Sequence, residues 1–141
     1  MRTISMIAAA AALLAPLPVL AQWSSVRDAQ LEKAEELMNE RGFSSVGKFQ
    51  ESSLDDGVSV TLTITLHGGI ATYLVGFCDG DCEDLDLTLY DVHGKELVSD
   101  LLKDDVPMLD LTPASTGSYR VKVTMAVCKA DPCYYGVQVF E

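Results

Sequence analysis

The chain has 141 residues, four cysteines and a formal net charge of −11 at pH 7. This acidity argues against nucleic acids and anionic membranes as partners, because both select basic patches. Residues 1–21 have the organisation of a secretory signal peptide, with Arg2 before the apolar residues 6–14 and with Val19 and Ala21 at the −3 and −1 positions of a cleavage site. The apolar run is too short for a spanning helix, which needs roughly 20 residues. We therefore expect a periplasmic or secreted protein that does not insert into the membrane after cleavage.

Residues 22–42 are predicted to form an N-terminal amphipathic helix, over 23–41 at its core. Its apolar residues recur at roughly helical spacing: Val26, Leu31, Ala34, Leu37 and Met38. Ser25 is placed to cap its start with Asp28 three residues on, and Gly42 to follow its end. We expect this helix to pack on its own domain, because one apolar stripe needs one covering surface. The alternative is a helix that binds a partner.

Residues 43–141 are predicted to form one β-sandwich domain, because short strands follow one another with turns between them. The predicted strands are 46–50, 58–66, 70–77, 84–90, 97–101, 106–111, 119–127 and 134–140. Segment 70–77 is apolar on both faces and reads as a central strand, whereas Pro107 keeps its segment off a central position. Seven or eight strands without helical patterns between them indicate two antiparallel sheets.

The four cysteines of an exported chain predict two disulfides. Their spacings, Cys78-x3-Cys82 and Cys128-x4-Cys133, differ from the usual zinc knuckles. Each pair closes a turn between successive strands, so we favour the local bonds Cys78–Cys82 and Cys128–Cys133. Cross-pairing of Cys78 with Cys128 and of Cys82 with Cys133 stays open, because both turns are expected at the same end of the sandwich.

The first cysteine pair lies in a dense run of carboxylates. Its acidic members are Asp79, Asp81, Glu83, Asp84 and Asp86. Calcium is one explanation, because this ion takes six to eight oxygen ligands from flexible loops. A second is cross-strand pairing of the acids with Arg120 and Lys122. A third is a solvated acidic turn whose surface ion pairs contribute only about 0–1 kcal/mol each.

No catalytic constellation is predicted. His67 and His93 stand in turns without a nucleophile motif nearby, and disulfide bonding would remove the cysteines as nucleophiles. We therefore predict a protein without catalytic residues. Recognition is expected from loops at one end or from the hydroxyl face of Thr61, Thr63 and Thr65, and that face is also typical of an ordinary solvated sheet surface.

Two motifs carry a resemblance to a known family. Asp-Leu-Asp-Leu-Thr-Leu-Tyr-Asp occupies 84–91 and is followed by His93-Gly94, and Gly-Ser-Tyr-Arg-Val-Lys-Val occupies 117–123, with an aromatic strand at 134–140. This half of the mature chain resembles the bacterial pre-peptidase C-terminal domain family. The resemblance implies an antiparallel, jelly-roll-like β-sandwich with a non-catalytic role in secretion or substrate binding, and calcium binding in some relatives. The cysteine-bearing turns look more like those of a group of exported bacterial proteins that carry this sandwich.

These observations predict an exported, non-catalytic binding or accessory module with an unidentified protein or glycan as its partner. The alternative is an inhibitor that blocks an envelope or secreted hydrolase through an exposed disulfide loop, because rigid loops lose little entropy on binding. A structural envelope protein without a small ligand is a third reading.

Overall fold

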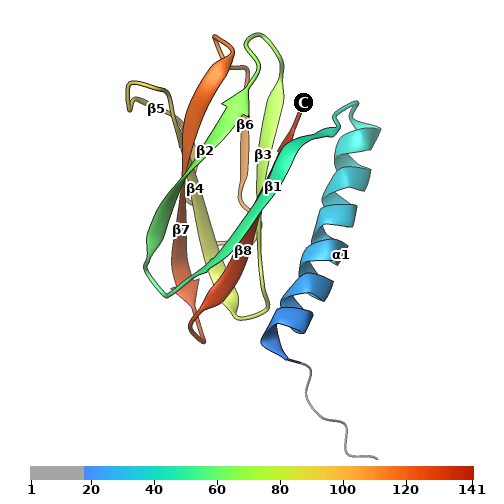
Figure 1. Cartoon of the computed structure of the whole chain (residues 1–141), viewed down its shortest axis with the longest axis vertical. Coiled ribbons are helices and arrows are strands. Elements are labelled where there is room, and N and C mark those ends of the chain that lie inside the picture. Colours follow the sequence, from blue (N-terminus) through green and yellow to red (C-terminus); the bar gives the residue numbers. More distant parts are fainter. Residues whose placement is uncertain (1–17) are drawn as a thin grey trace, which may run out of the picture.

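The computed structural model describes residues 18–141, which form one helix and eight strands in two antiparallel sheets (Figure 1). The helix is α1 (Val19–Glu40). The strands are β1 (Ser45–Leu54), β2 (Ser59–Leu66), β3 (Thr72–Cys78), β4 (Cys82–Tyr90), β5 (Glu96–Asp100), β6 (Met108–Leu111), β7 (Gly117–Cys128) and β8 (Cys133–Phe140). Sheet A has the order β1-β8-β3-β6, and sheet B has the order β2-β7-β4-β5. The expectation of a mostly-β chain with antiparallel strands is confirmed.

The core lies between the two sheets and follows the period-two pattern of the strands. Leu85, Leu87 and Leu89 of β4 are fully buried, while Asp84 and Asp86 alternate with them on the outer face of sheet B. The inward residues of β7 and β8 belong to the same cluster. β3 is buried along both faces and lies between β8 and β6, so its prediction as a central strand is confirmed.

Helix α1 covers the outer face of sheet A, as Figure 1 shows. Ala34 and Met38 pack there against Phe77 of β3 and Phe140 of β8. The expectation that the helix packs on its own domain is therefore confirmed. Leu37, which the apolar stripe included, is 42 % exposed because it lies at the rim of a cleft facing β6 rather than over the sheet.

The first turns of α1 are attached to β1 and β8 by an aromatic and ionic contact. Trp23 is buried and stacks on Tyr134 with 6.0 Å between ring centroids. Its Nε1–H donates to Glu51 Oε2 at 2.9 Å, and Arg27 binds both oxygens of the same carboxylate at 2.9 and 3.0 Å. These contacts hold the start of the helix against the sandwich.

The start of α1 differs from the sequence-based prediction, whereas its end agrees with it. The helix begins directly after Pro18, so the prediction that Ser25 caps it is wrong: no residue of 19–24 interrupts the helix, and Ser25 lies inside it. The end is confirmed, since Gly42 has φ +86° and Phe43 N–H donates to Met38 O at 2.9 Å. Residues 1–17 of the predicted signal peptide lie outside the described residues, and residues 19–21 form the first turn of α1.

Strand β1 is longer than the predicted segment 46–50, and its register shifts between Val46 and Gln50. At this irregularity the side chain of Phe49 points toward α1, and its ring lies on Gly136 of β8. A Cβ on that glycine would lie 2.8 Å from two ring carbons. Gln50 points to the other side, and its Nε2–H donates to Thr63 O at 3.1 Å. Pairing with β8 therefore overrides the polar composition of residues 51–53, which reads as a loop.

Candidate functional site

A pocket of about 560 Å³ opens at one end of the sandwich, where the β4–β5 hairpin meets the β6–β7 loop. This volume falls in the usual range for small-ligand sites, about 300–1,000 Å³. The hairpin contributes Asp91, Val92, His93 and Leu97, and the loop contributes residues 111–119. The pocket therefore combines apolar side chains with hydroxyl groups, a mixture typical of binding sites.

The β6–β7 side of this end pocket is held by hydrogen bonds from the neighbouring β2–β3 loop. Gly68 N–H donates to Thr116 Oγ1 at 2.9 Å, and Gly69 N–H donates to Pro113 O at 2.8 Å. A Cβ on Gly68 would lie 2.7 Å from the Cα of Ser115, so only glycine permits this close approach. The loop wall is therefore fixed before any ligand arrives.

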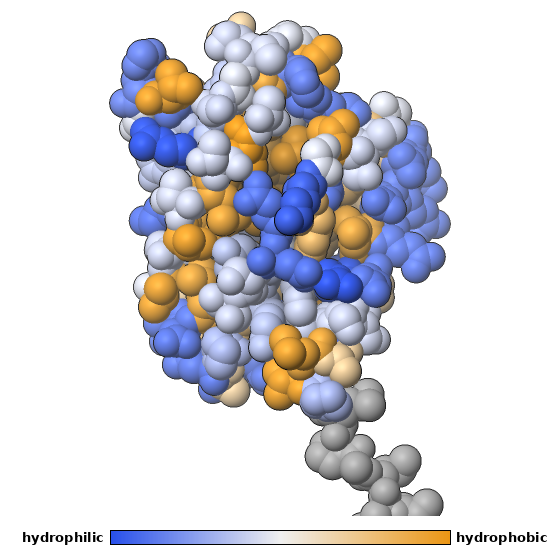
Figure 2. All heavy atoms as spheres, in the orientation of Figure 1, coloured by the Kyte–Doolittle hydropathy of each residue, from blue (hydrophilic) through white to orange (hydrophobic). Residues whose placement is uncertain are grey.

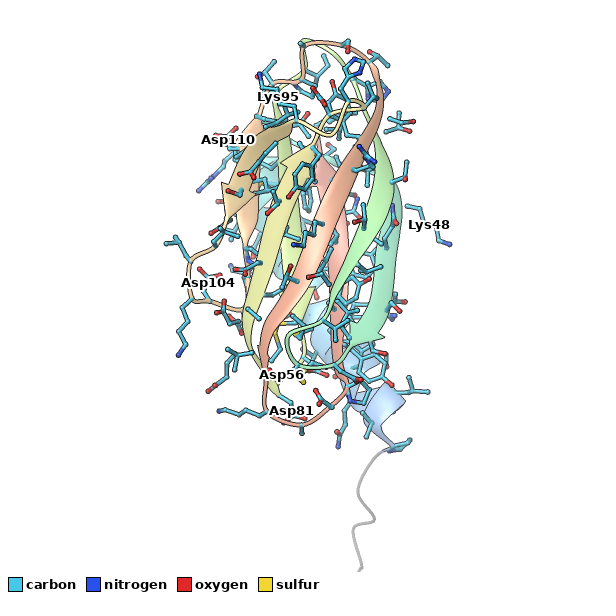
Figure 3. The ribbon with its side chains drawn as sticks, turned by 90° about the vertical axis from the view of Figure 1, so that its left-hand side faces the viewer. Lys48, Asp56, Asp81, Lys95, Asp104 and Asp110 are labelled. Carbon is cyan, nitrogen blue, oxygen red and sulfur yellow. A yellow bond between two sulfur atoms is a disulfide. The ribbon has the colours of Figure 1, made fainter. Side chains whose placement is uncertain are left out.

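The hairpin side of the end pocket is organised by Asp91. Its Oδ1 accepts the backbone N–H of Lys95 and of His93, each at 2.9 Å. The hydrogen bond from Lys95 N–H is the main cause that holds the pKa of Asp91 below its usual value, and the bond from His93 N–H acts in the same direction. Oδ1 of this carboxylate is therefore used within its own turn, and His93 and the hydroxyl groups bring further polar groups to the pocket. Figure 3 shows Lys95 at this end of the molecule.

The two histidines lie in different surroundings. His93 is exposed and lines the end pocket. His67 follows β2, and its Nδ1 lies 2.5 Å from Glu141 Oε2 while its backbone N–H donates to Oε1 of the same carboxylate at 3.2 Å. The sequence indicated turn histidines but not the pocket, because the pocket depends on which loops the sheets bring together.

The cysteine-bearing turns lie at the opposite end of the sandwich. The structure has the local bonds Cys78–Cys82 and Cys128–Cys133, with Cα–Cα separations of 5.9 Å in each. Lys129 N–H donates to Asp81 O at 2.9 Å, so the two turns support each other. The expectation that they share one end is confirmed, and Cys82 stands directly across from Cys128 in the β4–β7 register.

The acidic residues of the first disulfide turn serve different contacts. Asp79 Oδ2 accepts the N–H of Tyr134 at 2.9 Å. Glu83 binds Lys129 Nζ at 2.6 Å, and this hydrogen bond lowers the pKa of Glu83. Asp81 is exposed at the tip of the turn, and Figure 3 shows it near Asp56. The five predicted ligands are thus divided between this turn and the face of β4.

Asp84 and Asp86 lie together on the outer face of β4. Burial, followed by the charges of Asp84, Asp100 and Asp104, raises the pKa of Asp86. Lys122 stands opposite Thr88 in the register, two positions from the pair of Asp86 with Thr124, so it lies diagonally from Asp86 rather than as its direct partner. Within residues 18–141, no three acidic, histidine or cysteine side chains form a group that could hold a metal ion. Calcium binding stays a prediction.

No protein-family model matches the chain, and no curated protein matches it. The resemblance to the pre-peptidase C-terminal family therefore stays an expectation drawn from two short motifs. In the part of the chain that the structure describes, no helix has the length and apolar character needed to cross a membrane. The function has to be argued from the site itself.

Proposed function

We propose that the protein is an exported, non-catalytic binding module whose ligand enters the end pocket. One observation carries this proposal: the pocket sets apolar side chains beside hydroxyl groups on two loops that are already fixed by hydrogen bonds. Binding by fixed loops costs little conformational entropy. The facing orders β1-β8-β3-β6 and β2-β7-β4-β5 support a jelly-roll-like arrangement of eight strands, as in the family that the motifs resemble.

The ligand that suits this pocket best is a neutral glycan. Ser115 and Ser118 supply hydroxyl groups, which both donate and accept hydrogen bonds, as sugar hydroxyls do, and Thr116 keeps its O–H as a donor while its Oγ1 accepts Gly68 N–H. Val92 and Leu97 are exposed and offer apolar surface for the C–H face of a sugar ring. The net charge of −11 disfavours anionic glycans.

A glycan array probed with the labelled protein tests this function. Val92→Glu should reduce binding at least tenfold, because Val92 is 60 % exposed in the pocket and the new charge would be placed where a neutral ligand packs. Val58→Glu is the matched control, since Val58 is also exposed but lies before β2 at the other end of the sandwich. Absence of glycan binding, or equal loss in both variants, would contradict the proposal.

Export is proposed from the sequence of residues 1–21, and the two disulfides support it because such bonds persist in oxidising compartments. The mature protein is expected to begin at or near Gln22 and to lie in the periplasm or outside the cell. Intact-mass analysis of protein recovered from the periplasm or medium tests this. A mass that retains residues 1–21 would refute cleavage without bearing on glycan binding.

Inhibition of a hydrolase is the second candidate, favoured by the braced turn between β7 and β8. Residues 129–132 are exposed, while Asp131 Oδ1 accepts the N–H of Asp56 at 2.7 Å and Asp56 Oδ1 accepts the N–H of Cys128 at 2.7 Å. Such a rigid tip suits insertion into an active site. This alternative predicts that the protein lowers a hydrolase activity of an envelope extract and that Ala130→Arg removes the effect. Unchanged activities with both proteins would exclude it.

A further inference from the structure

Strand β2 is an edge strand, and within residues 18–141 no strand pairs with its outward backbone groups. Met125 N–H donates to Val58 O at 2.9 Å, and the register continues without a shift from Ser59 to Leu66. Because bonded and non-bonded pairs alternate in an antiparallel ladder, the even-numbered residues of β2 bond to β7. The N–H and C=O groups of Thr61, Thr63 and Thr65 therefore point away from the sheet. Gln50 Nε2–H, which donates to Thr63 O, occupies one of these groups.

β2 lacks the features that keep the other three edge strands of the sandwich from pairing with a further strand. β1 has an irregular register and exposes Lys48. β6 is short and follows Pro107, and its Met108 N–H donates to Asp100 Oδ2 at 2.9 Å. β5 begins with Glu96 and has a register shift against β4. β2 instead has eight residues with no charge, proline or bulge, which is the form that accepts an added strand.

A groove with a mixed polar and apolar lining runs beside this edge, between β1 and β2. It consists of two hollows of about 450 and 220 Å³ that share Lys48 and Gln50 in their linings. Val60, Leu62 and Ile64 line it from β2. Figure 2 shows recessed apolar side chains between polar ones on this face of the molecule. A strand added to β2 would place alternate side chains in this groove, since successive side chains point to opposite faces.

Cations flank the β2 edge on an otherwise acidic protein. Lys122 and Arg120 of β7 stand opposite Thr61 and Thr63, and all four side chains are exposed on the outer face of sheet B. Figure 3 looks onto this face and shows Lys48 reaching outward beyond β2. Neither cation of β7, nor Lys48, takes part in an ion pair within residues 18–141. The edge is therefore electrostatically suited to carboxylates.

We propose that β2 accepts an extended segment of a partner protein as an additional strand. Its apolar side chains would enter the groove, and its acidic side chains would lie on the outer face beside Thr61 and Thr63, within reach of Lys122 and Arg120. This interaction is separate from the end pocket. A second copy of the chain fits less well, because it would add the same cations about 14 Å away, three strand spacings, and a second net charge of −11.

The test uses two labelled synthetic peptides of about ten residues, one alternating Val with Glu and one alternating Val with Lys. Fluorescence anisotropy should show saturable binding of the Val/Glu peptide that is at least tenfold tighter than binding of the Val/Lys peptide. Thr61→Pro should weaken binding about tenfold or more, because proline removes an N–H of the free edge without removing a bond to β7. Thr61→Val is the matched control: it keeps the N–H and the branched shape, and it should bind as the unchanged protein does.

Hydrogen exchange in the unchanged protein gives a second readout that does not depend on how the proline variant folds. The Val/Glu peptide should slow exchange of the amides of Thr61 and Thr65 selectively. The proposal is overturned if both peptides bind equally, if no saturable binding occurs up to about 1 mM, or if these amides stay unprotected. A dimer that forms with rising concentration and that Thr61→Pro abolishes would assign the edge to a second copy instead. Val92→Glu should leave peptide binding unchanged, which separates this test from that of the end pocket.

Discussion

Replacing Gly136 with alanine tests how β1 is held against sheet A. A Cβ at this position would lie 2.8 Å from two ring carbons of Phe49 and closer still to Cζ. β8 is hydrogen-bonded to β1 on one side and to β3 on the other, so its backbone has no room to recede. Gly136 has no positive φ, and alanine is therefore compatible with its backbone conformation. The ring of Phe49 has to move.

The expected free-energy changes follow from two opposing terms. Forcing one extra carbon into a packed contact costs about 1–3 kcal/mol, while alanine in place of glycine in a strand favours folding by about 0.5–1 kcal/mol. Gly136→Ala should therefore lower the free energy of unfolding by about 1–2 kcal/mol. In a protein that already carries Phe49→Ala the clash is absent, and the same change should be neutral or stabilising. The coupling energy is then about 2 kcal/mol.

Urea unfolding measures this coupling in a double-mutant cycle of four proteins: the unchanged protein, Gly136→Ala, Phe49→Ala and the variant with both changes. Trp23 is the only tryptophan and stacks on Tyr134, so its fluorescence reports the undocking of α1, and far-UV circular dichroism reports the sheets. Coincident transitions by the two probes would justify a two-state treatment. A destabilisation by Gly136→Ala that is the same with and without Phe49 would refute the proposed contact between ring and glycine.

Three further predictions concern the acidic face and the disulfides. Asp86→Asn should raise the melting temperature at pH 7, because burial and neighbouring carboxylates disfavour only the charged form of Asp86 in the folded state and so raise its pKa. The advantage should shrink as the pH falls through this raised pKa and disappear below the pKa of an unfolded aspartate, about 3.9. An equal effect at pH 7 and at low pH would contradict this sign. Calcium binding predicts melting temperatures that rise with millimolar calcium and fall with chelator, and this effect should be lost when Asp81→Asn is combined with Asp84→Asn. Melting curves that superimpose with calcium and with chelator would contradict calcium binding by these carboxylates. Peptide mapping without reduction should find only the two local disulfides, whereas a peptide joining residues near 80 to residues near 130 would overturn that pairing.

Local sequence patterns predicted the features that depend on residues close together in the chain. The alternation of Leu85, Leu87 and Leu89 with polar residues indicated a strand with one buried face, and all three leucines are fully buried. Gly42 marked the end of α1, because glycine readily takes the positive φ needed there. Pro107 likewise indicated that β6 lies at an edge.

Features that depend on contacts distant in sequence were missed. The sequence predicts α1 over 23–41 with Ser25 as its cap, whereas the helix begins directly after Pro18, seven residues before Ser25. β1 was predicted to be short because its second half is polar, yet β8 pairs with it as far as Leu54. The end pocket joins a hairpin at 91–97 to a loop at 111–119, and the β2 edge is unpaired only because the sheet order leaves it outermost. Sheet order cannot be read from period or turn chemistry alone.

The positions of β7 and β8 determine when this protein is able to fold during its synthesis. β8 lies between β1 and β3, and β7 lies between β2 and β4, so the middle strand of each sheet is made after every strand it joins. Until residues from Gly117 onward have left the ribosome, the earlier strands lack most of their backbone partners, and such distant pairings form slowly. Neither four-stranded sheet can therefore close before almost the whole sequence has been synthesised.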